Sequence, residues 1–308
     1  MPQLPSPGNS TEPNLTSHAT PLAAYSRTLS RRDALYRGVT ACALASTGLS
    51  EICTATTSDD PYQPFQMGIQ SYSLRGYGLD DALKHTRALG LRFWESYRGH
   101  FPVTTVPKDW KQYQETLKRA GVRMVAFGVE PFTENKDENR RRFEFAKAMG
   151  IETLSADPTP ESLDHLDRLV EEYDVSIAIH NHGPGARYDS IEDTSRVLAN
   201  HHEKIGACVD TGHYLRSRED PLKALHTFGK RVYGVHLKDV KQLKGKESQF
   251  TILGEGDLDV DGCLRYLYDV KYAYCMALEY EENEENPIAD LQQSLAVVRK
   301  SLQKIRTA

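Results

Sequence analysis

The feature that most constrains the fold of this chain is a regular alternation of short strand-like runs with longer helical segments after Pro61. β-Branched and aromatic residues dominate the short runs, and apolar residues recur every three or four positions in the longer ones. This pattern is typical of βα units and a parallel sheet. The predicted strands are residues 66–74, 92–97, 123–129, 152–156, 175–180, 205–209, 232–237 and 274–280.

Amphipathic helices are predicted between these runs, at residues 79–89, 110–120, 162–173 and 288–305. Gly90, Gly121 and Gly150 stand where three helices should end, because glycine adopts the left-handed cap conformation at little cost. Eight βα units predict an α/β fold of the closed (β/α)8 or TIM barrel type, which takes about 250 residues. The alternative, a doubly wound open sheet, would require a glycine-rich phosphate loop that residues 74–78 do not supply.

Residues 1–60 have a different composition, rich in Ser, Thr, Pro and Asn and without sustained periodicity. Within them, Arg31 and Arg32 precede a run of small and apolar residues at 38–49, which resembles a bacterial twin-arginine export signal. We therefore expect residues 1–60 to be an export signal and disordered tether, and residues 61–308 to be the barrel. This interpretation implies a periplasmic enzyme, and a cytoplasmic one if the arginine pair belongs only to a basic tail.

Charge and composition exclude several classes of protein. The 38 basic and 43 acidic residues give a net charge of −5, which disfavours a nucleic acid as the main ligand. No apolar run approaches the roughly 18 to 20 residues of a membrane-spanning helix. The five cysteines form no Cys-x-x-Cys pair, so a metal would need other ligands.

Polar side chains collect where the predicted strands end, which is where a barrel carries its chemistry. The residues concerned are Glu95, His180, His182, Asp210, His213, His236, Lys238, Glu279 and Glu281. A rim of imidazoles and carboxylates is typical of a divalent-cation site for Mn, Co, Zn or Mg.

The ordered motifs at 209–213 (VDTGH), 235–239 (VHLKD), 253–259 (LGEGDLD) and 278–281 (LEYE) resemble the xylose isomerase-like barrel superfamily. That group includes sugar phosphate isomerases and epimerases, inosose dehydratases and, more distantly, the endonuclease IV family. In similar epimerases Glu, Asp, His and Glu hold one metal ion, which implies Asp210, His236 and Glu279 here. His180 stands in place of the first glutamate. We therefore expect one divalent ion on His180, Asp210, His236 and Glu279, with Glu281 as the reserve ligand.

The resemblance implies a reaction in which the ion, acting as a Lewis acid, stabilises the enediolate of a keto-sugar or polyol. Epimerases of this group use two metal-bound glutamates on opposite faces of the substrate, and His180 leaves only Glu279. Isomerisation or epimerisation is nevertheless the expected activity, and dehydration or glycoside elimination, including elimination from 3-keto-glycosides, is the alternative. His182, together with His180, also resembles the His-x-His of inosose dehydratases.

The roles expected of individual residues follow from these reactions. Glu279 is the candidate base, and His182, His213 and Lys238 are the candidate acids, since imidazole titrates near neutrality and a nearby cation lowers the pKa of a lysine. The residues expected to contact a small sugar or keto-sugar are Trp94, Glu95 and Glu255.

Two other classes of function compete with a sugar enzyme. One is a catalytically silent sugar-binding barrel, which would hold no metal. The other is an endonuclease IV-like nuclease, which is disfavoured because this chain supplies ligands for about one ion and has no basic excess. Relatives of this kind often pair through barrel helices, so a homodimer is one expected assembly.

Overall fold

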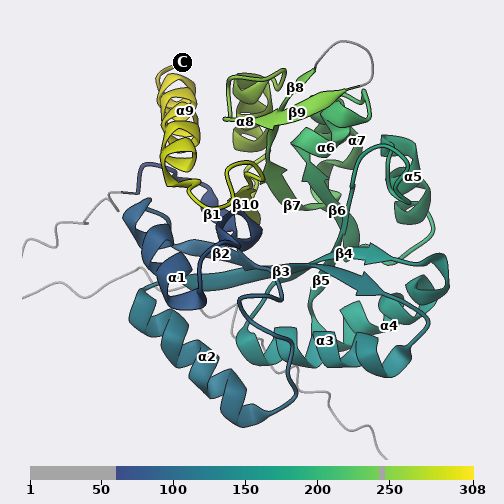
Figure 1. Cartoon of the computed structure of the whole chain (residues 1–308). Coiled ribbons are helices and arrows are strands. Elements are labelled where there is room, and N and C mark those ends of the chain that lie inside the picture. The colour runs from purple at the N-terminus through teal and green to yellow at the C-terminus, as the bar shows by residue number, and fades with distance from the viewer. Residues whose placement is uncertain (1–59, 243–246) are drawn as a thin grey trace, which may run out of the picture. The chain divides into compact units, whose positions relative to one another are not determined.

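Eight parallel strands close into a barrel in the computed structural model, which describes residues 60–242 and 247–308 (Figure 1). Around the barrel the strand order is β1-β10-β7-β6-β5-β4-β3-β2, and β1 pairs with both β2 and β10. The strands are β1 (Gln66–Gln70), β2 (Phe93–Ser96), β3 (Arg123–Phe132), β4 (Thr153–Pro158), β5 (Ser176–His180), β6 (Ile205–Asp210), β7 (Val232–Leu237) and β10 (Cys275–Leu278). The predicted (β/α)8 barrel is confirmed.

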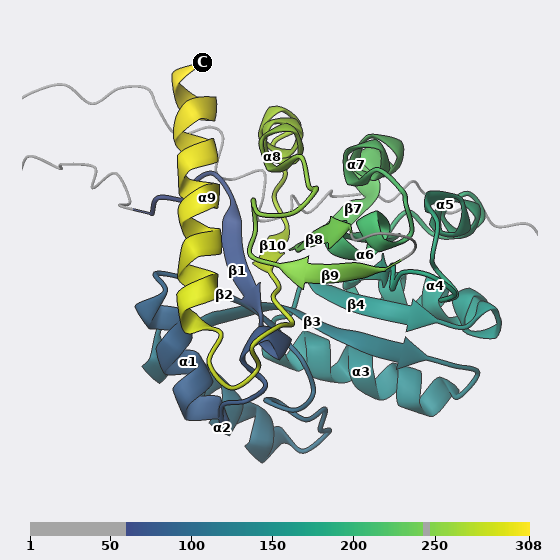
Figure 2. The same cartoon turned by 45° about the horizontal axis from the view of Figure 1, so that its top comes forward.

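Helices surround the strands and bury their apolar faces against them (Figures 1 and 2). They are α1 (Leu79–Ala88), α2 (Pro107–Ala120), α3 (Lys136–Met149), α4 (Leu163–Tyr173), α5 (Ile191–Leu198), α6 (Thr211–Arg216), α7 (Pro221–Phe228), α8 (Val260–Asp269) and α9 (Ile288–Thr307). Gly121 and Gly150 end α2 and α3 with φ of 66° and 70°, as the sequence predicts. None of the described helices is long and apolar enough to cross a membrane.

The first strand is shorter than predicted. Residues Ser71–Leu74 form a 3-10 turn, η2, instead of continuing β1. The side chain of Gln70 accepts a hydrogen bond from the backbone N–H of Tyr72 and so caps this turn. The chain consequently leaves the barrel wall at the level of the rim.

A two-stranded antiparallel hairpin follows β7 and was not predicted. It consists of β8 (Asp239–Gln242) and β9 (Ser248–Thr251) and lies beside α6 (Figures 1 and 2). The hairpin returns through the turn at 254–258, whose backbone N–H groups surround the buried carboxylate of Asp239. Gly254 and Gly256 donate to its Oδ2 at 2.8 and 3.1 Å, and Val240 and Leu258 donate to its Oδ1 at 2.8 and 3.0 Å.

This turn therefore binds an anion that the chain itself supplies. A Cβ on residue 256 would lie 2.3 Å from Asp239 Oδ1, so the close approach of the loop requires Gly256. The two arginines of the predicted export signal, Arg31 and Arg32, lie outside the described residues.

Candidate metal centre and active site

Four side chains meet inside the rim of the barrel, each from the carboxyl end of a different strand. His180 ends β5, Asp210 ends β6, His236 lies one residue before the end of β7, and Glu279 follows β10. All four are buried, with between 0% and 8% of each residue exposed. These are the residues that the sequence predicts as metal ligands, and the barrel places them in one group.

The spacing of their polar atoms suits a single ion. His236 Nδ1 lies 3.1 Å from His180 Nε2, 2.9 Å from Glu279 Oε2 and 3.6 Å from Asp210 Oδ2. His180 Nε2 lies 3.5 Å from the same Asp210 oxygen. Ligand atoms that each stand roughly 2.0–2.2 Å from one ion are about 3 Å apart. Asp210 Oδ2 and Glu279 Oε2 are also buried and accept no well-aligned hydrogen bond, although Lys238 Nζ forms an ion pair with each at 3.0 Å. The residues present therefore fit a divalent metal ion.

The position of Asp210 follows from local structure. It is the N-cap of α6, and its Oδ1 accepts the backbone N–H of His213 at 2.7 Å, which leaves Oδ2 for the ligand group. Asn181, which follows β5, exchanges two hydrogen bonds with the backbone of Asp210 at 2.9 and 3.0 Å. A cap and an amide bridge thus hold this carboxylate before any ion binds.

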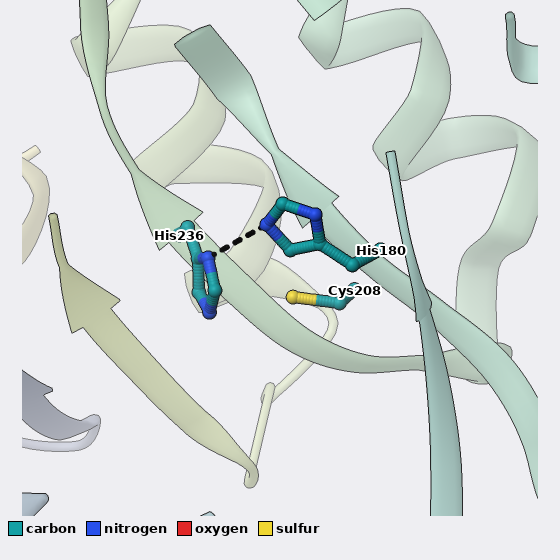
Figure 3. A group of neighbouring side chains, drawn as sticks. All are labelled: His180, Cys208 and His236. Carbon is teal, nitrogen blue, oxygen red and sulfur yellow. Dashed lines mark hydrogen bonds between the residues drawn. The ribbon is translucent and has the colours of Figure 1, made fainter. Parts of the chain in front are cut away.

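Cys208 lies two residues before Asp210 on β6, and its sulfur lies beside the rings of His180 and His236 (Figure 3). Sequence analysis assigned no thiol to the site. Burial raises the pKa of Cys208, which disfavours the thiolate that binds metals. Asp210 and Glu279, by contrast, have pKa values below their usual range, because Lys238 and the histidines outweigh the effect of burial. The carboxylate group is thus the better ligand set.

Glu95 reaches His236 from the opposite side of the ligand group. It lies on β2, is 0% exposed, and its Oε2 is 3.0 Å from His236 Nε2. Nε2 can therefore donate its proton to Glu95, and with an ion bound the lone pair of Nδ1 would face the other candidate ligands. Glu95 and Glu279, among other neighbours, outweigh burial and raise the pKa of His236. A carboxylate behind a ligating histidine fixes the tautomer and orientation of the ring.

Replacing Glu95 with Gln is expected to weaken binding of Mn²⁺ or Zn²⁺ by about 10- to 100-fold, because the neutral amide orients the His236 ring less strongly. Competition with a chromophoric chelator measures this affinity, and thermal unfolding checks the fold. Glu130→Gln is the matched control, since Glu130 is also a buried strand carboxylate but pairs with Arg98 and Arg142. An unchanged affinity in Glu95→Gln would show that Glu95 does not position His236.

Lys238 brings a buried cation to the same rim. Its Nζ lies 3.0 Å from Asp210 Oδ2, 3.0 Å from Glu279 Oε2 and 2.6 Å from Glu281 Oε1. Burial opposes the charge, but these three carboxylates outweigh burial and raise the pKa of Lys238. The prediction that a nearby cation lowers the pKa of Lys238 is wrong, because the nearest charged groups are anions. Glu281, the predicted reserve ligand, pairs with Lys238 and lies outside the ligand group.

His213 is held as a neutral imidazole. Burial lowers its pKa to about 2. Arg216 can only donate, and its Nη1 lies 2.9 Å from His213 Nδ1, whereas Lys238 Nζ lies 3.5 Å from His213 Nε2. Nδ1 is therefore the acceptor and Nε2 carries the hydrogen. Burial likewise lowers the pKa of His182. Both histidines can thus donate a neutral N–H bond, but neither is an imidazolium acid at neutral pH.

A cavity of about 450 Å³ opens onto this group, with His180, His182, His213 and Glu279 in its lining. Trp94, Glu95 and Glu255 were predicted to contact the substrate, but they do not line this cavity. Neighbouring strand residues face opposite ways, so Trp94 packs in the core at 0% exposure while Glu95 points inward behind His236. Glu255 lies exposed in the turn after β9.

Sequence analysis also missed residues at the cavity. Arg98 and Arg216 line it, and Phe250 of β9 lies against the ring of His213 at 5.7 Å between centroids. Arg216 stands three residues after His213, one helical turn on, and this spacing is a signal that the sequence offered. Phe250 gave no signal, because the hairpin that positions it was not predicted.

The fold and site define a barrel with a group of side chains that could hold a metal ion at the carboxyl ends of its strands. A family model for the xylose isomerase-like TIM barrel matches residues 83–301. The chain belongs to the xylose isomerase-like TIM barrel family.

Individual relatives agree with this assignment. The inosose dehydratase of Lactiplantibacillus plantarum is 30% identical over 149 residues, which cover 43% of this chain and 49% of that protein. The chain thus spans about half the length of the curated relatives it matches. A Parabacteroides distasonis protein of uncharacterised function superposes with a TM-score of 0.60 and 26% identity over 78% of this chain and 98% of its own. An IolI protein with a bound zinc atom superposes with a TM-score of 0.63 and 17% identity, covering 78% of this chain and 98% of its own.

Proposed function

We propose that this protein is a divalent-metal-dependent lyase that dehydrates a keto-sugar or an inosose. The observation that carries this proposal is the pairing of the Glu279 carboxylate with the Lys238 ammonium, 3.0 Å apart, beside a histidine where an epimerase would need a second carboxylate. A base and a proton donor side by side suit removal of a proton and of a hydroxyl group from the same face of a substrate. The 30% sequence identity to an inosose dehydratase over 149 residues supports the same reaction class.

The proposed reaction balances as a proton relay. A divalent ion on His180, Asp210, His236 and Glu279 would polarise the substrate carbonyl. Glu279 takes the proton from the carbon beside the carbonyl, and the carbon–oxygen bond one carbon further breaks. The departing hydroxide takes a proton from Lys238 and leaves as water. The resulting amine, 3.0 Å from Glu279, recovers the proton from the carboxyl group.

Isomerisation is the second candidate function. Glu279 alone can move a proton between neighbouring carbons of a keto-sugar, and this needs no second carboxylate. Epimerisation is less well supported, because His180, a ligand whose pKa burial lowers to about 4, replaces a glutamate.

Incubation of the metal-loaded protein in deuterated water with a panel of ketohexoses, inososes, fructose 6-phosphate and a keto-uronate tests the proposal. We expect deuterium beside the carbonyl by NMR and a dehydrated product from at least one substrate. At equal metal occupancy, checked because Lys238 pairs with Asp210 and Glu279, Lys238→Met should lower the dehydration rate by about 10²- to 10⁴-fold while exchange continues.

The chelated protein is the control, and its exchange should stop. A keto-sugar isomer as the sole product would favour the second candidate. Absence of exchange on the whole panel by a fully metallated protein would indicate a silent sugar-binding barrel and overturn the proposal.

A further inference from the structure

Arg216, the last residue of α6, differs from the other charged groups around the cavity because it has no counter-ion. The other charged residues that line the cavity all have partners: Glu279 and Glu281 pair with Lys238, and Arg98 pairs with Glu130. Within residues 60–242 and 247–308, no carboxylate forms an ion pair with the Arg216 guanidinium. A partly exposed guanidinium without a protein counter-ion is available to pair with an anionic ligand.

The guanidinium is held in place at the cavity. One of its N–H groups donates to His213 Nδ1 at 2.9 Å, and its planar group lies 5.3 Å from the ring centroid of Phe250. Arg216 lines the same cavity of about 450 Å³ as Glu279. A guanidinium carries five N–H donors, so most of them remain for a ligand.

We propose that Arg216 binds an anionic group of the substrate, and that the substrate of this barrel is therefore an acidic sugar derivative and not a neutral one. This inference rests on the proposed function for the presence of a sugar in the cavity. A carboxylate and a phosphate ester share the required chemistry, since both accept two parallel N–H bonds from a guanidinium. Contact with Phe250 and His213 orients the Arg216 guanidinium before a ligand binds, which lowers the entropic cost of binding.

Arg98 provides the matched comparison because it lines the same cavity but is neutralised. Its Nη2 lies 2.9 Å from Glu130 Oε1, and Glu130 is buried. If every arginine at the cavity bound anions, replacing Arg98 would weaken the binding of an anionic sugar as much as replacing Arg216. The structure predicts that they differ.

Isothermal titration of the metal-loaded protein with glucuronate, glucose 6-phosphate and glucose at constant ionic strength tests the inference. We expect at least one anionic sugar to bind more tightly than glucose by about 10- to 100-fold, the range of a hydrogen bond to a charged group. Arg216→Met should remove this preference, and Arg98→Met should retain it. Preference for glucuronate identifies a carboxylate ligand, and preference for glucose 6-phosphate identifies a phosphate ester.

Two results would overturn the inference: neither anionic sugar binds the wild-type protein better than glucose, or the preference survives in Arg216→Met. Both are independent of turnover. An Arg216-dependent preference without deuterium exchange would support the anion site while removing the proposed reaction. Deuterium exchange without a preference for anionic sugars would support the proposed reaction and remove the anion site.

Discussion

The Asp210→Asn variant is expected to bind Mn²⁺ or Zn²⁺ more than about 100-fold more weakly than the wild type, because loss of a ligand should exceed the 10- to 100-fold cost of losing a ligand's supporting partner. Asparagine keeps the oxygen that caps α6 through the His213 N–H, so the barrel should remain folded. His236→Ala should show the same loss, since Nδ1 of His236 is 3.6 Å or less from an atom of each other ligand. Equilibrium dialysis with metal analysis measures the effect, and circular dichroism checks the fold.

Two variants control for other groups that could hold an ion. Cys208→Ser tests the overlapping group of Cys208 with the two histidines, and it should retain the metal. Asp167→Asn tests the more exposed group that Asp167 forms with Asp164 and His201, and it should also retain the metal. A fully metallated Asp210→Asn, His236→Ala double variant would contradict the ligand assignment.

Replacing Asp239 with Ala is expected to lower the free energy of unfolding by about 3–5 kcal/mol, because buried backbone N–H groups lose a charged acceptor. Gly254, Gly256 and Leu258 donate to this carboxylate from the turn after β9, so the loss falls on the hairpin return. Asp239→Asn retains one acceptor oxygen and should lose less. Urea unfolding of the chelated protein measures the difference without a contribution from bound metal.

Hydrogen exchange locates the effect of the Asp239 substitution. The amides of Gly254, Gly256 and Leu258 should exchange faster in Asp239→Ala, whereas amides of β4 and β5 should change little. Glu255→Gln is the control from the same turn, because Glu255 is exposed and should change stability by less than about 0.5 kcal/mol. Equal stability of Asp239→Ala and Glu255→Gln would show that the carboxylate does not hold this turn.

Local patterns in the chain were enough to predict the barrel and the polar residues at its rim. Strand residues are short runs of β-branched and aromatic side chains, and these repeat along the sequence where any reader can count them. Because all strands of a barrel run parallel, residues at their carboxyl ends must meet at one rim. The polar strand ends could therefore be grouped at one rim without any knowledge of distances, and the family resemblance then indicated His180, Asp210, His236 and Glu279 as the expected ligands.

The tertiary structure alone decided which side chains lie against the candidate ligands. These contacts depend on side-chain direction and join distant segments of the chain. Glu95 and His236 are 141 residues apart, and only the closure of β2, β1, β10 and β7 into one wall brings them to 3.0 Å. The raised pKa of Lys238 likewise depends on three carboxylates from β6 and from the segment after β10. Pairing of this kind has no local sequence period.

The same reason separates Trp94 and Glu95, which the sequence places side by side at a strand end. Their opposite directions on β2 send one into the core and the other behind His236. The hairpin of β8 and β9 had no such signal, and it alone brings Phe250 over Arg216. The sequence by itself determined the barrel and the polar residues at its rim, because these follow from periodicity and strand direction. Only the folded chain decided which neighbours tune them, because those contacts join segments that no local pattern connects.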